Sequence, residues 1–389
     1  MKLLLIADGR SPITRRWITM LGPLKYELVL ISSYPCDPLV GVKKLYILPL
    51  AFASQGGSQA GNGSKSAIKG IISRFRPVAQ RLRHLLGPWT ILQHVGDYLD
   101  ILKTEKPDRV HAFRIPFEGM LASATPPEYP LILSTWGNDF TLHASSTGRM
   151  ETMTRRALQR ADALMSDTQR DVKLAQKWGF DSQKPALVVP GNGGTDVDEL
   201  TEITKGIEHA EPPQVINPRG LRSYIRTDTF FKAIPLVLAK HPEVQFVCAS
   251  MEGQSLPLKW VKLLGIEKNV RFLPYVSQPD LWREYAKSQV MVSISTHDGS
   301  PNSLLEAMAL GCFPICGRIE SIQEWIVDGE NGLLVDPDDP NALANAILQA
   351  LENAELRRAA AERNAQLIRE NAGIQAARSK VQELYERLV

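Results

Sequence analysis

The segment VMVSISTHDGSPNSLLEAMALGCFPIC, residues 290–316, decides how the fold of this chain is read. A short apolar run is followed by a loop of small polar residues, then by a Leu- and Ala-rich helical stretch, and then by a second apolar run, FPIC. A helix capped by Asn302 or Ser303 would leave backbone N–H groups and the positive end of its dipole facing the loop. The segment therefore predicts a strand, an anion-binding loop and a helix in a parallel α/β sheet.

Two carboxylates bracket this loop. Asp298 lies at its mouth and Glu306 lies one turn into the helix, with seven residues between them. A carboxylate repels an anion, but it accepts hydrogen bonds from sugar hydroxyls. The loop therefore suits a ligand that carries both phosphate groups and sugar hydroxyls.

The same alternation of strands and helices extends over the whole chain of 389 residues, a length that favours two domains. Near-continuous apolar runs indicate buried parallel strands. They occupy residues 3–7, 28–32, 109–113, 131–135, 163–167 and 186–190, and again 214–217, 244–249, 270–274, 290–295 and 313–316. Between the two groups, the charged segment 195–213 is typical of a linker, and the tail from Asn341 is predicted to be helical.

These segments resemble a known family. From about Val215 to Leu351 the chain resembles the retaining, nucleotide-sugar-dependent glycosyltransferases of family 4, or group 1 type. The resemblance rests on DGSPNSLLE (298–306), which matches the family's E-x7-E motif with Asp in the first position, and on AMALGCFPIC (307–316) and SIQEWIVDGENGLLVDPDDPNALANAI (321–347). VVPGNGGTDVDEL (188–200) resembles the family's interdomain turn, and LILSTWGNDF (131–140) resembles a strand of its first domain.

The resemblance implies the GT-B fold, an α/β architecture of two Rossmann-like, doubly wound parallel-sheet domains facing across a cleft. Residues 1–205 would form the acceptor-side domain and residues 206–372 the nucleotide-sugar donor domain. Residues 373–389 would form a C-terminal helix that packs back on the first domain.

The resemblance also implies the donor site. Glu306 would bind the ribose hydroxyls and Asp298 the hydroxyls of the donor sugar. The loop backbone would line the sugar and the pyrophosphate, through Gly299, Ser300, Pro301, Asn302, Ser303 and Leu304. The family places an Arg and a Lys after the first strand of its second domain, and here PRGLRSYIRTD (218–228) offers only arginines. Arg226 takes the Lys position and Arg219 or Arg222 the Arg position, and Arg keeps the charge while adding bidentate phosphate geometry.

On the acceptor side the family often has a His in the loop after residues 131–135, where this chain has Trp136. Asp139 is the nearest polar substitute, and His111 is a second candidate. The loop ADGRSP (7–12), with Gly9 and Arg10, would face the acceptor, and it lacks the G-x-G-x-x-G motif of NAD-binding folds. The expected catalytic set is therefore Arg219, Arg226, Asp298 and Asp139.

We expect neither a metal nor a cofactor beyond the donor substrate. Fixed cations and helix-terminal N–H groups can stabilise a leaving phosphate without a metal. The two D-x-D sequences, residues 196–198 and 336–338, are interpreted as structural because neither follows a strand in the arrangement that a metal-binding motif needs. The four cysteines include no C-x-x-C pair.

Charge is distributed unevenly along the chain. Residues 38–96 contain no Asp or Glu and carry eight basic residues, Lys43, Lys44, Lys65, Lys69, Arg74, Arg76, Arg81 and Arg83. Two interpretations stay open: a patch that binds an anionic membrane surface or acceptor, and a solvated helix face beside a loop. Nucleic acid is not expected as a partner, because regularly spaced aromatic residues are missing from the segment.

The sequence thus predicts a retaining, metal-independent glycosyltransferase that moves a sugar from a nucleoside-diphosphate sugar to a glycan, lipid-linked or small-molecule acceptor. The alternatives are a nucleotide-sugar epimerase or hydrolase of the same fold, and a non-catalytic sugar-nucleotide-binding protein. The apolar start MKLLLIADGR meets Asp8 early, and no later run approaches the roughly 18 apolar residues of a membrane span. We therefore expect a cytoplasmic protein, with the inner face of the membrane as a peripheral site of association.

Overall fold

The computed structural model describes residues 1–51 and 66–388, with side chains described for all of these except 66–82 and 192. The chain divides into two compact units. The first comprises Met1–Gly193 together with the residues from Arg378 onward, and the second comprises Gly194–Ala377. Of the predicted basic segment, Lys65 and the side chains of Lys69, Arg74, Arg76 and Arg81 lie outside this description.

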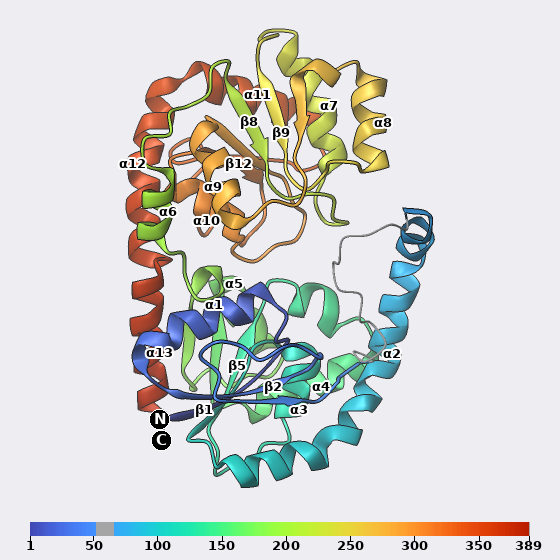
Figure 1. Cartoon of the computed structure of the whole chain (residues 1–389), viewed down its shortest axis with the longest axis vertical. Helices are drawn as coiled ribbons and strands as arrows, with labels where there is room; N and C mark the ends of the chain where they lie inside the picture. The colour runs from blue at the N-terminus through green and yellow to red at the C-terminus, as the bar shows by residue number, and fades with distance from the viewer. Residues whose placement is uncertain (52–65, 389) are drawn as a thin grey trace. The chain divides into compact units, whose positions relative to one another are not determined.

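The first unit is built on a seven-stranded parallel sheet with the order β3-β2-β1-β4-β5-β6-β7 (Figure 1). Its inner strands are buried almost throughout, as expected for a sheet covered on both faces. The strands are β1 (Lys2–Ala7), β2 (Glu27–Ser32), β3 (Lys44–Ile47), β4 (Arg109–Ala112), β5 (Leu131–Thr135), β6 (Ala163–Ser166) and β7 (Ala186–Val188).

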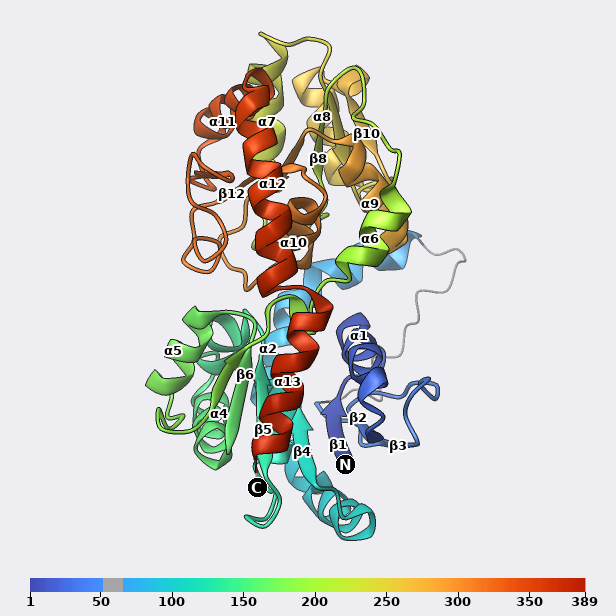
Figure 2. The ribbon, with the colours of Figure 1, turned by 90° about the vertical axis from the view of Figure 1, so that its left-hand side faces the viewer.

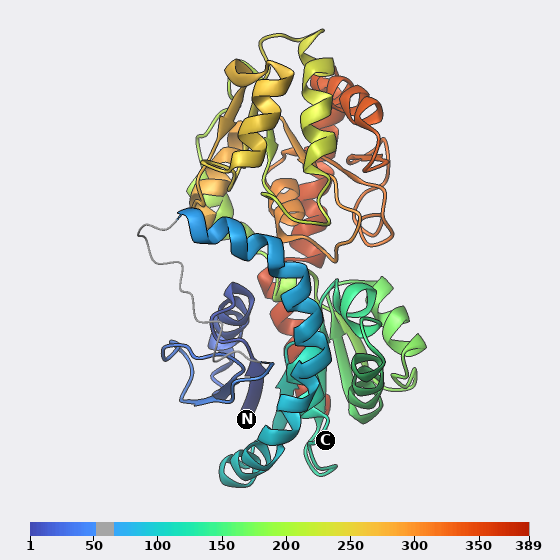
Figure 3. The same cartoon turned by 90° about the vertical axis from the view of Figure 1, so that its right-hand side faces the viewer.

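The helices of the first unit begin at polar caps in the loops that follow the strands. Ser11, Thr147 and Thr168 each accept a hydrogen bond from a backbone N–H in the first turn of the helix they precede. These helices are α1 (Pro12–Leu21), α2 (Ser66–Glu105), α3 (Met120–Ala122), α4 (Gly148–Arg160) and α5 (Gln169–Lys177), with short helical segments at η1 (Gly22–Leu24), η2 (Ile115–Gly119), η3 (Asp139–Ala144) and η4 (Pro190–Asn192). The C-terminal half of the long α2, which is drawn in cyan in Figure 3, buries Ile91, Tyr98 and Leu102 in the core of this unit.

The second unit holds a six-stranded parallel sheet with the order β10-β9-β8-β11-β12-β13. Its strands are β8 (Gln214–Asn217), β9 (Gln245–Cys248), β10 (Val270–Phe272), β11 (Val290–Ser293), β12 (Phe313–Gly317) and β13 (Leu333–Val335). Its helices are α6 (Val197–Thr204), α7 (Thr227–Leu238), α8 (Ser255–Leu264), η5 (Glu267–Asn269), α9 (Gln278–Lys287), α10 (Asn302–Ala309), α11 (Pro340–Glu352) and α12 (Ala354–Asn371). In both sheets the strand order reverses next to the first strand, between β1 and β4 in the first unit and between β8 and β11 in the second. Open α/β sheets bind ligands at such a switch point.

The last helix, α13 (Ile374–Arg387), runs along the strands of the first unit in Figure 2. Arg378 Nε donates a hydrogen bond to the carbonyl of Met20 at 2.7 Å, and the Tyr385 hydroxyl lies 2.6 Å from His111 Nδ1. Tyr385 is fully buried, so the C-terminal helix forms part of the core of the first unit.

The predicted fold class and the predicted strands are confirmed, with ends that differ by one or two residues. Strands β3 and β13 were not predicted. The interpretation of residues 195–213 as a linker is wrong over α6. Asp196 caps that helix, and Val197 and Leu200 pack in the core of the second unit. The division between the units therefore lies after Gly193, ahead of the predicted boundary at residue 205.

No helix in the described part of the chain is both long and apolar enough to cross a bilayer.

Candidate active site

The loop between β11 and α10 is the centre of the candidate site in the second unit. Helix α10 begins at Asn302, and Pro301 occupies the cap position without a side-chain bond. Neither Asn302 nor Ser303 caps the helix as predicted, because both already lie in its first turn after the extended Pro301. The Ser303 hydroxyl accepts a hydrogen bond from Arg219. The N–H of Leu304, one of the residues expected to line the pyrophosphate, donates to the Pro301 carbonyl at 2.9 Å.

Arg219 joins this loop to the loop after β8. Its Nη2 donates to Asp298 Oδ2 at 2.7 Å and its Nη1 to Ser303 Oγ at 3.1 Å. The Arg219 side chain is only 8% exposed and that of Asp298 14%, so this ion pair lies largely out of water. Arg219 Nε is buried and has no hydrogen-bond partner among the described residues. We call Arg219, Asp298 and Ser303 the arginine–loop cluster.

Backbone contacts hold the two loops in register. Ile225 forms a bridge with Ser295, the Arg226 N–H donates to the Ile294 carbonyl at 3.0 Å, and the Thr296 N–H donates to the Tyr224 carbonyl at 2.9 Å. Before them Gly220 has a φ of +64°, which favours glycine and lets the chain turn after β8. The position of Arg219 is therefore fixed by the backbone on both sides.

Glu306, the second carboxylate of the predicted motif, lies in the helix and is only 3% exposed. Its Oε1 accepts a hydrogen bond from Gln278 Nε2 on α9 at 2.5 Å. Tyr285, also on α9, is completely buried, and burial raises the pKa of its phenol, with the nearby Glu306 charge adding to the rise. The carboxylate therefore sits in a low-dielectric pocket where a hydrogen bond to it is strong.

Residues that the sequence analysis did not select support the loop from behind. The Trp325 indole N–H donates to Ser300 Oγ at 2.9 Å, and Ser321 Oγ donates to the Asp298 carbonyl at 2.8 Å. The Gly299 N–H lies 3.2 Å from Asp298 Oδ1. Both residues lie in the segment 321–347, which carries part of the family resemblance, but nothing in that segment identifies them as partners of the loop at 298–300.

The other two predicted arginines lie outside the arginine–loop cluster. Arg226 Nη2 pairs with Asp338 Oδ1 at 2.7 Å, and Arg222 Nη1 donates to the Tyr224 hydroxyl at 3.0 Å. Both line a pocket of about 540 Å³ together with Trp260. Of Arg219 and Arg222, Arg219 is the one whose side chain bonds to the loop among the described residues, and the choice between them for the family's Arg position stays a prediction.

The first unit has its own pocket, of about 550 Å³, which we call the N-pocket. Part of its lining comes from residues that directly follow β1, β2, β4 and β5, the carboxyl ends where parallel sheets bind ligands. The rest comes from α2, η2 and η3. The lining includes Asp8, Tyr34, Arg83, His84, Phe113, Arg114, Phe117, Glu118, Trp136 and His143.

Two of the predicted acceptor-side residues lie beside the N-pocket. Arg10 forms two hydrogen bonds of 3.1 Å with Asp8, and its guanidinium stacks 3.6 Å from the centre of the Tyr34 ring. Gly9 is packed so closely that a Cβ would lie 2.4 Å from Cys36 Sγ. Gly9 therefore allows the loop to approach β2, and Arg10 shapes the wall of the pocket.

The other two candidates are buried behind it. His111 is fully buried, and its ring nitrogens lie 2.6 Å from the Tyr385 hydroxyl and 2.7 Å from Ser134 Oγ. Burial lowers the pKa of His111 to about 3. Asp139 is likewise buried. It accepts hydrogen bonds from Arg114 Nη2 at 2.7 Å and from two backbone N–H groups at 3.2 Å, so it positions Arg114, which lines the N-pocket.

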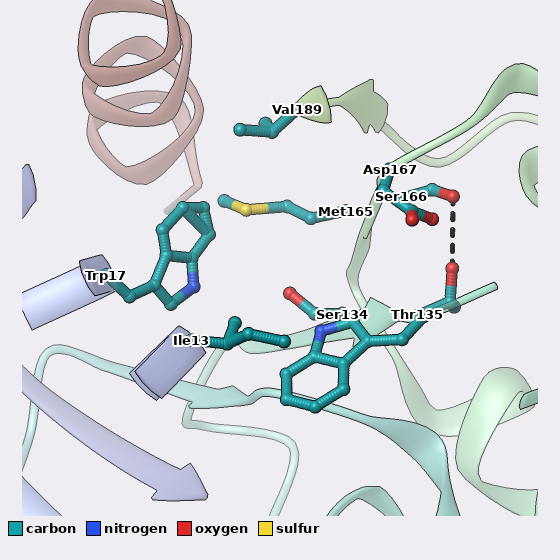
Figure 4. A pocket seen from close by; sticks show the side chains of 9 residues that line it. Ile13, Trp17, Ser134, Thr135, Met165, Ser166, Asp167 and Val189 are labelled. Atoms are coloured by element: carbon teal, nitrogen blue, oxygen red, sulfur yellow. Dashed lines mark hydrogen bonds between the residues drawn. The ribbon is translucent and has the colours of Figure 1, made fainter. Parts of the chain in front are cut away.

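A second, much smaller cavity lies at the ends of β5 and β6 (Figure 4). Trp17 and Met165 border it, and Thr135 Oγ1 donates to Ser166 Oγ at 3.1 Å on its edge. Its volume of about 10 Å³ leaves room for about one water molecule. The N-pocket is therefore the better candidate for a substrate in this unit.

The acidic residues of both D-x-D sequences form hydrogen bonds and ion pairs within the second unit, among them the pair of Asp338 with Arg226 described above. Asp196 caps α6, and Asp198 pairs with Arg369 at 2.7 Å. Asp336 Oδ1 accepts the N–H of Asp338 at 2.9 Å. Over the described residues, no three His, Cys, Asp or Glu side chains come together in a group that could hold a metal ion.

Two models of known protein families match the chain, one in each of its two units. The family model described as glycosyl transferases group 1 matches residues 200–367, and the model described as glycosyl transferase 4-like matches residues 78–168. The chain belongs to the group 1, family 4 type of glycosyl transferases. The first match carries the arginine–loop cluster and Glu306, and the second carries most of the N-pocket.

The D-inositol 3-phosphate glycosyltransferase of Corynebacterium urealyticum is 28% identical over 221 residues, which is 52% of this chain and 51% of that protein. The O-antigen chain mannosyltransferase B of Escherichia coli is 36% identical over 94 residues, 24% of each chain. The matches span about half or less of the length of these relatives.

Similarity to solved structures extends over the whole chain. Sucrose-phosphate synthase from Thermosynechococcus elongatus has a TM-score of 0.71 at 16% identity, over 100% of this chain and 99% of that one. At this identity the likeness establishes the fold, which is the predicted GT-B fold.

Proposed function

We propose that the protein is a retaining glycosyltransferase that moves a sugar from a nucleoside-diphosphate sugar to an acceptor, without a metal. The observation that carries the proposal is the arginine–loop cluster: a buried arginine bonded to a carboxylate and a serine at the start of a helix, in a chain of this family. The Anabaena HepE structure, which has the same fold with a TM-score of 0.70 at 13% identity over 100% of both chains, holds UDP.

Each residue of the site has a role in this proposal. Cleavage of the bond to the anomeric carbon places negative charge on the leaving phosphate, and fixed cations that need no reorganisation stabilise that charge. Arg219 and Arg226 supply the cations. Glu306, held by Gln278, accepts hydrogen bonds from ribose hydroxyls, and Asp298 accepts them from the donor sugar.

The expected stereochemical outcome is retention. An oxocarbenium-like carbon forms as the phosphate leaves, and the acceptor attacks from the same face with the leaving phosphate as its base. This part of the proposal rests on family membership. The acceptor is held by the first unit, where the N-pocket has the size and the position at the strand ends that a sugar-sized ligand needs.

The first test is a thermal-shift screen of UDP-, GDP- and ADP-sugars in the presence of EDTA. A ligand that binds only the folded state raises the melting temperature. We expect one nucleotide to raise it, with little added effect of Mg²⁺ or Mn²⁺. Glu306→Ala should abolish the shift, whereas the matched control Glu267→Ala, at an exposed site on η5 of the same unit, should preserve it.

Donor turnover with and without an acceptor then separates the alternatives. Consumption of the donor that needs an acceptor supports a transferase. Consumption without one would indicate a hydrolase or an epimerase, and binding without turnover would indicate a non-catalytic protein. Absence of any nucleotide shift, also after metal is added, would contradict the proposal.

We also propose a cytoplasmic location with peripheral association at an anionic membrane surface through α2. The outward face of this helix exposes Leu85, Leu86, Trp89 and Leu92, and the latter two are 53% and 61% exposed. The guanidinium of Arg149 lies 3.5 Å from the centre of the Trp89 ring, which adds a cation to the apolar face. An apolar face of this kind beside basic residues suits the interface of an anionic bilayer.

Flotation with vesicles tests this part. The variant Trp89→Ala/Leu92→Ser should bind phosphatidylglycerol vesicles less than the parent protein does. The control Leu263→Ser, which removes another exposed leucine on α8, should bind them unchanged. Equal flotation of all three proteins would remove the membrane from the proposal.

A further inference from the structure

Two carboxylates and two arginines line the N-pocket, and among the described residues only one of each forms an ion pair. Asp8 is engaged with Arg10 through two bonds of 3.1 Å, and Arg114 is paired with Asp139 at 2.7 Å. Glu118 is buried, and its Oε1 accepts a hydrogen bond from Ser33 Oγ at 2.5 Å. Asp8 and Arg114 are thus each matched by an opposite charge, whereas the hydrogen bond to Glu118 comes from a neutral hydroxyl. Burial raises the pKa of the Glu118 carboxyl, and the charges of Arg114 and Arg83 oppose that rise.

Arg83 is the second cation of the lining, and its charge acts on the Glu118 carboxyl. Its guanidinium lies 4.9 Å from the centre of the Phe117 ring and 5.6 Å from that of Tyr34, and no carboxylate of the described residues forms an ion pair with it. Its Nε is buried without a hydrogen-bond partner among the same residues. The aromatic rings hold the guanidinium in place but do not neutralise it. A positive charge is thus fixed in the wall of a pocket large enough for a ligand.

The histidines of the pocket add polarity without adding charge. His84 Nε2 and His143 Nδ1 lie 3.2 Å apart, and their rings meet edge to face. Burial lowers the pKa of both, that of His143 to about 4, so both are neutral near pH 7. They can donate or accept hydrogen bonds to hydroxyls. The two histidines therefore add no positive charge to the pocket, and the arginines Arg83 and Arg114 are the cations of its lining.

Aromatic side chains make up much of the remaining wall. Tyr34, Phe113, Phe117 and Trp136 line the pocket, and flat apolar surface with a few placed polar groups is the usual lining of a small-molecule site. Rings of this kind can cover the apolar face of a sugar, while a stacked arginine binds a carboxylate or a phosphate with two parallel hydrogen bonds.

We infer that the N-pocket binds an acceptor that carries an anionic group, a phosphate or a carboxylate, beside its sugar ring, and that Arg83 receives this group. This inference rests on the proposed function, in which the first unit holds the acceptor. It assigns Arg83 as a specificity-determining residue and restricts the acceptor to acidic or phosphorylated compounds.

The test is calorimetric titration of the full chain with three probes: glucose, glucose 6-phosphate and glucuronate. We expect at least one of the two acidic probes to bind at least tenfold more tightly than glucose. The comparison between them tells phosphate from carboxylate. Arg83→Gln should weaken the binding of the preferred acid at least tenfold and leave glucose unaffected. Arg83→Lys should keep part of the preference, because it retains the charge and loses the bidentate geometry.

The matched control is Arg155→Gln. Arg155 also stacks on an aromatic ring, 4.8 Å from the centre of Trp178, in the same unit and outside the lining of the pocket. It should bind every probe as the parent protein does. The nucleotide-induced melting shift, measured on each variant, reports separately on the donor site of the second unit.

Three results would overturn the inference while the nucleotide shift persists: equal binding of all three probes, no binding of either acid, or an Arg83→Gln variant that retains the acid preference. Loss of the nucleotide shift in the parent protein would instead count against the proposed function. Should Arg83→Gln fail to fold, Arg83→Lys carries the test: a preference for the acid as strong as that of the parent protein would overturn the role of the guanidinium.

Discussion

Removal of Arg219 should destabilise the second unit strongly, although Arg219 lies in a loop. In Arg219→Met, Asp298 loses the cation of its ion pair in a site where it is only 14% exposed. Breaking a buried ion pair by deleting one member costs about 3 to 5 kcal/mol, because the other charge is left desolvated and unpaired. Since Asp298 keeps some contact with water and lies 3.2 Å from the Gly299 N–H, we expect the lower end, about 3 kcal/mol.

The assay is differential scanning calorimetry. For a unit of this size, about 3 kcal/mol corresponds to a fall in melting temperature of about 6–12 °C. The double variant Arg219→Met/Asp298→Asn should recover about half of the loss, because the stranded charge is gone. The coupling energy between the two positions, which is this recovery plus the cost of Asp298→Asn alone, should then be at least about 1.5 kcal/mol, within the range for residues in direct contact.

The control is an ion pair of the same length at the surface. Arg369 and Asp198 also lie 2.7 Å apart, in the same unit, and both are exposed. Arg369→Met should cost less than about 1 kcal/mol. Equal losses in the two Arg→Met variants, or a double variant whose loss is the plain sum of the single losses, would refute the reasoning that burial gives the Arg219 pair its weight.

Three further predictions concern buried polar side chains. Ser300→Ala should cost about 1–2 kcal/mol in urea unfolding, because the buried Trp325 N–H loses its acceptor, and the double variant with Trp325→Phe should cost less than the sum of the two. Burial lowers the pKa of His111 to about 3, against about 6.5 for an unperturbed histidine. The stability that depends on its neutral form should therefore be lost as pH falls from about 6.5 to 3, by an amount on the order of a few kcal/mol. A His111→Gln variant, measured by thermal unfolding over the same range, should show a flatter profile. Hydrogen bonds from Lys2, Lys44 and Tyr46 lower the pKa of Glu105 to about 2. Glu105→Gln should therefore destabilise the protein by about 2 kcal/mol at pH 7, and the difference in stability between the two proteins should shrink as pH falls from about 4.5 towards 2. A difference in stability that stays the same at low pH would show that the ionised carboxylate is not its cause.

Local patterns predicted the sheets well, and they failed where burial is partial. Strand β3, KLYI, lies at a sheet edge and carries Lys44, so it lacks the continuous apolar run that marks the inner strands. Strand β13 has only three residues. Helix α6 buries only Val197, Leu200 and Thr204 along one stripe, and its exposed charges gave it the composition of a linker. In each case the sequence does not show which side of the short strand or helix is covered by the rest of the chain.

The same distinction applies to the candidate site. Arg219, Asp298 and Ser303 could be selected from the sequence because all three lie in or next to loops that follow strands, and strand order brings such loops together. Gln278 and Trp325 could not, because their contacts with Glu306 and Ser300 depend on how whole helices and turns pack. His111 stands in a strand that is buried on both faces, which leaves it no route to a ligand. For choosing candidate site residues, the position of a residue directly after a strand was therefore more useful than its residue type.

The arginine–loop cluster has a consequence for the proposed donor. Arg219 cannot bind a diphosphate with full strength while its Nη2 is held by Asp298 at 2.7 Å, so the carboxylate and the phosphate compete for one guanidinium. Asp298→Asn replaces a charge-assisted hydrogen bond by a neutral one, a difference of about 1.4 kcal/mol. We therefore expect Asp298→Asn to bind the free nucleoside diphosphate about tenfold more tightly than the parent protein, while it turns the donor sugar over more slowly.

Calorimetric titration with the diphosphate measures this directly, with Asp198→Asn as the control at the exposed ion pair. The two readouts should move in opposite directions, because the asparagine releases the arginine for the phosphate and loses the acceptor for the sugar hydroxyls. Weaker diphosphate binding in Asp298→Asn would show that Asp298 holds Arg219 in the position that the phosphate needs. The carboxylate would then be a positioning residue for the arginine, and its place in the motif would be explained by the ion pair and not by the sugar.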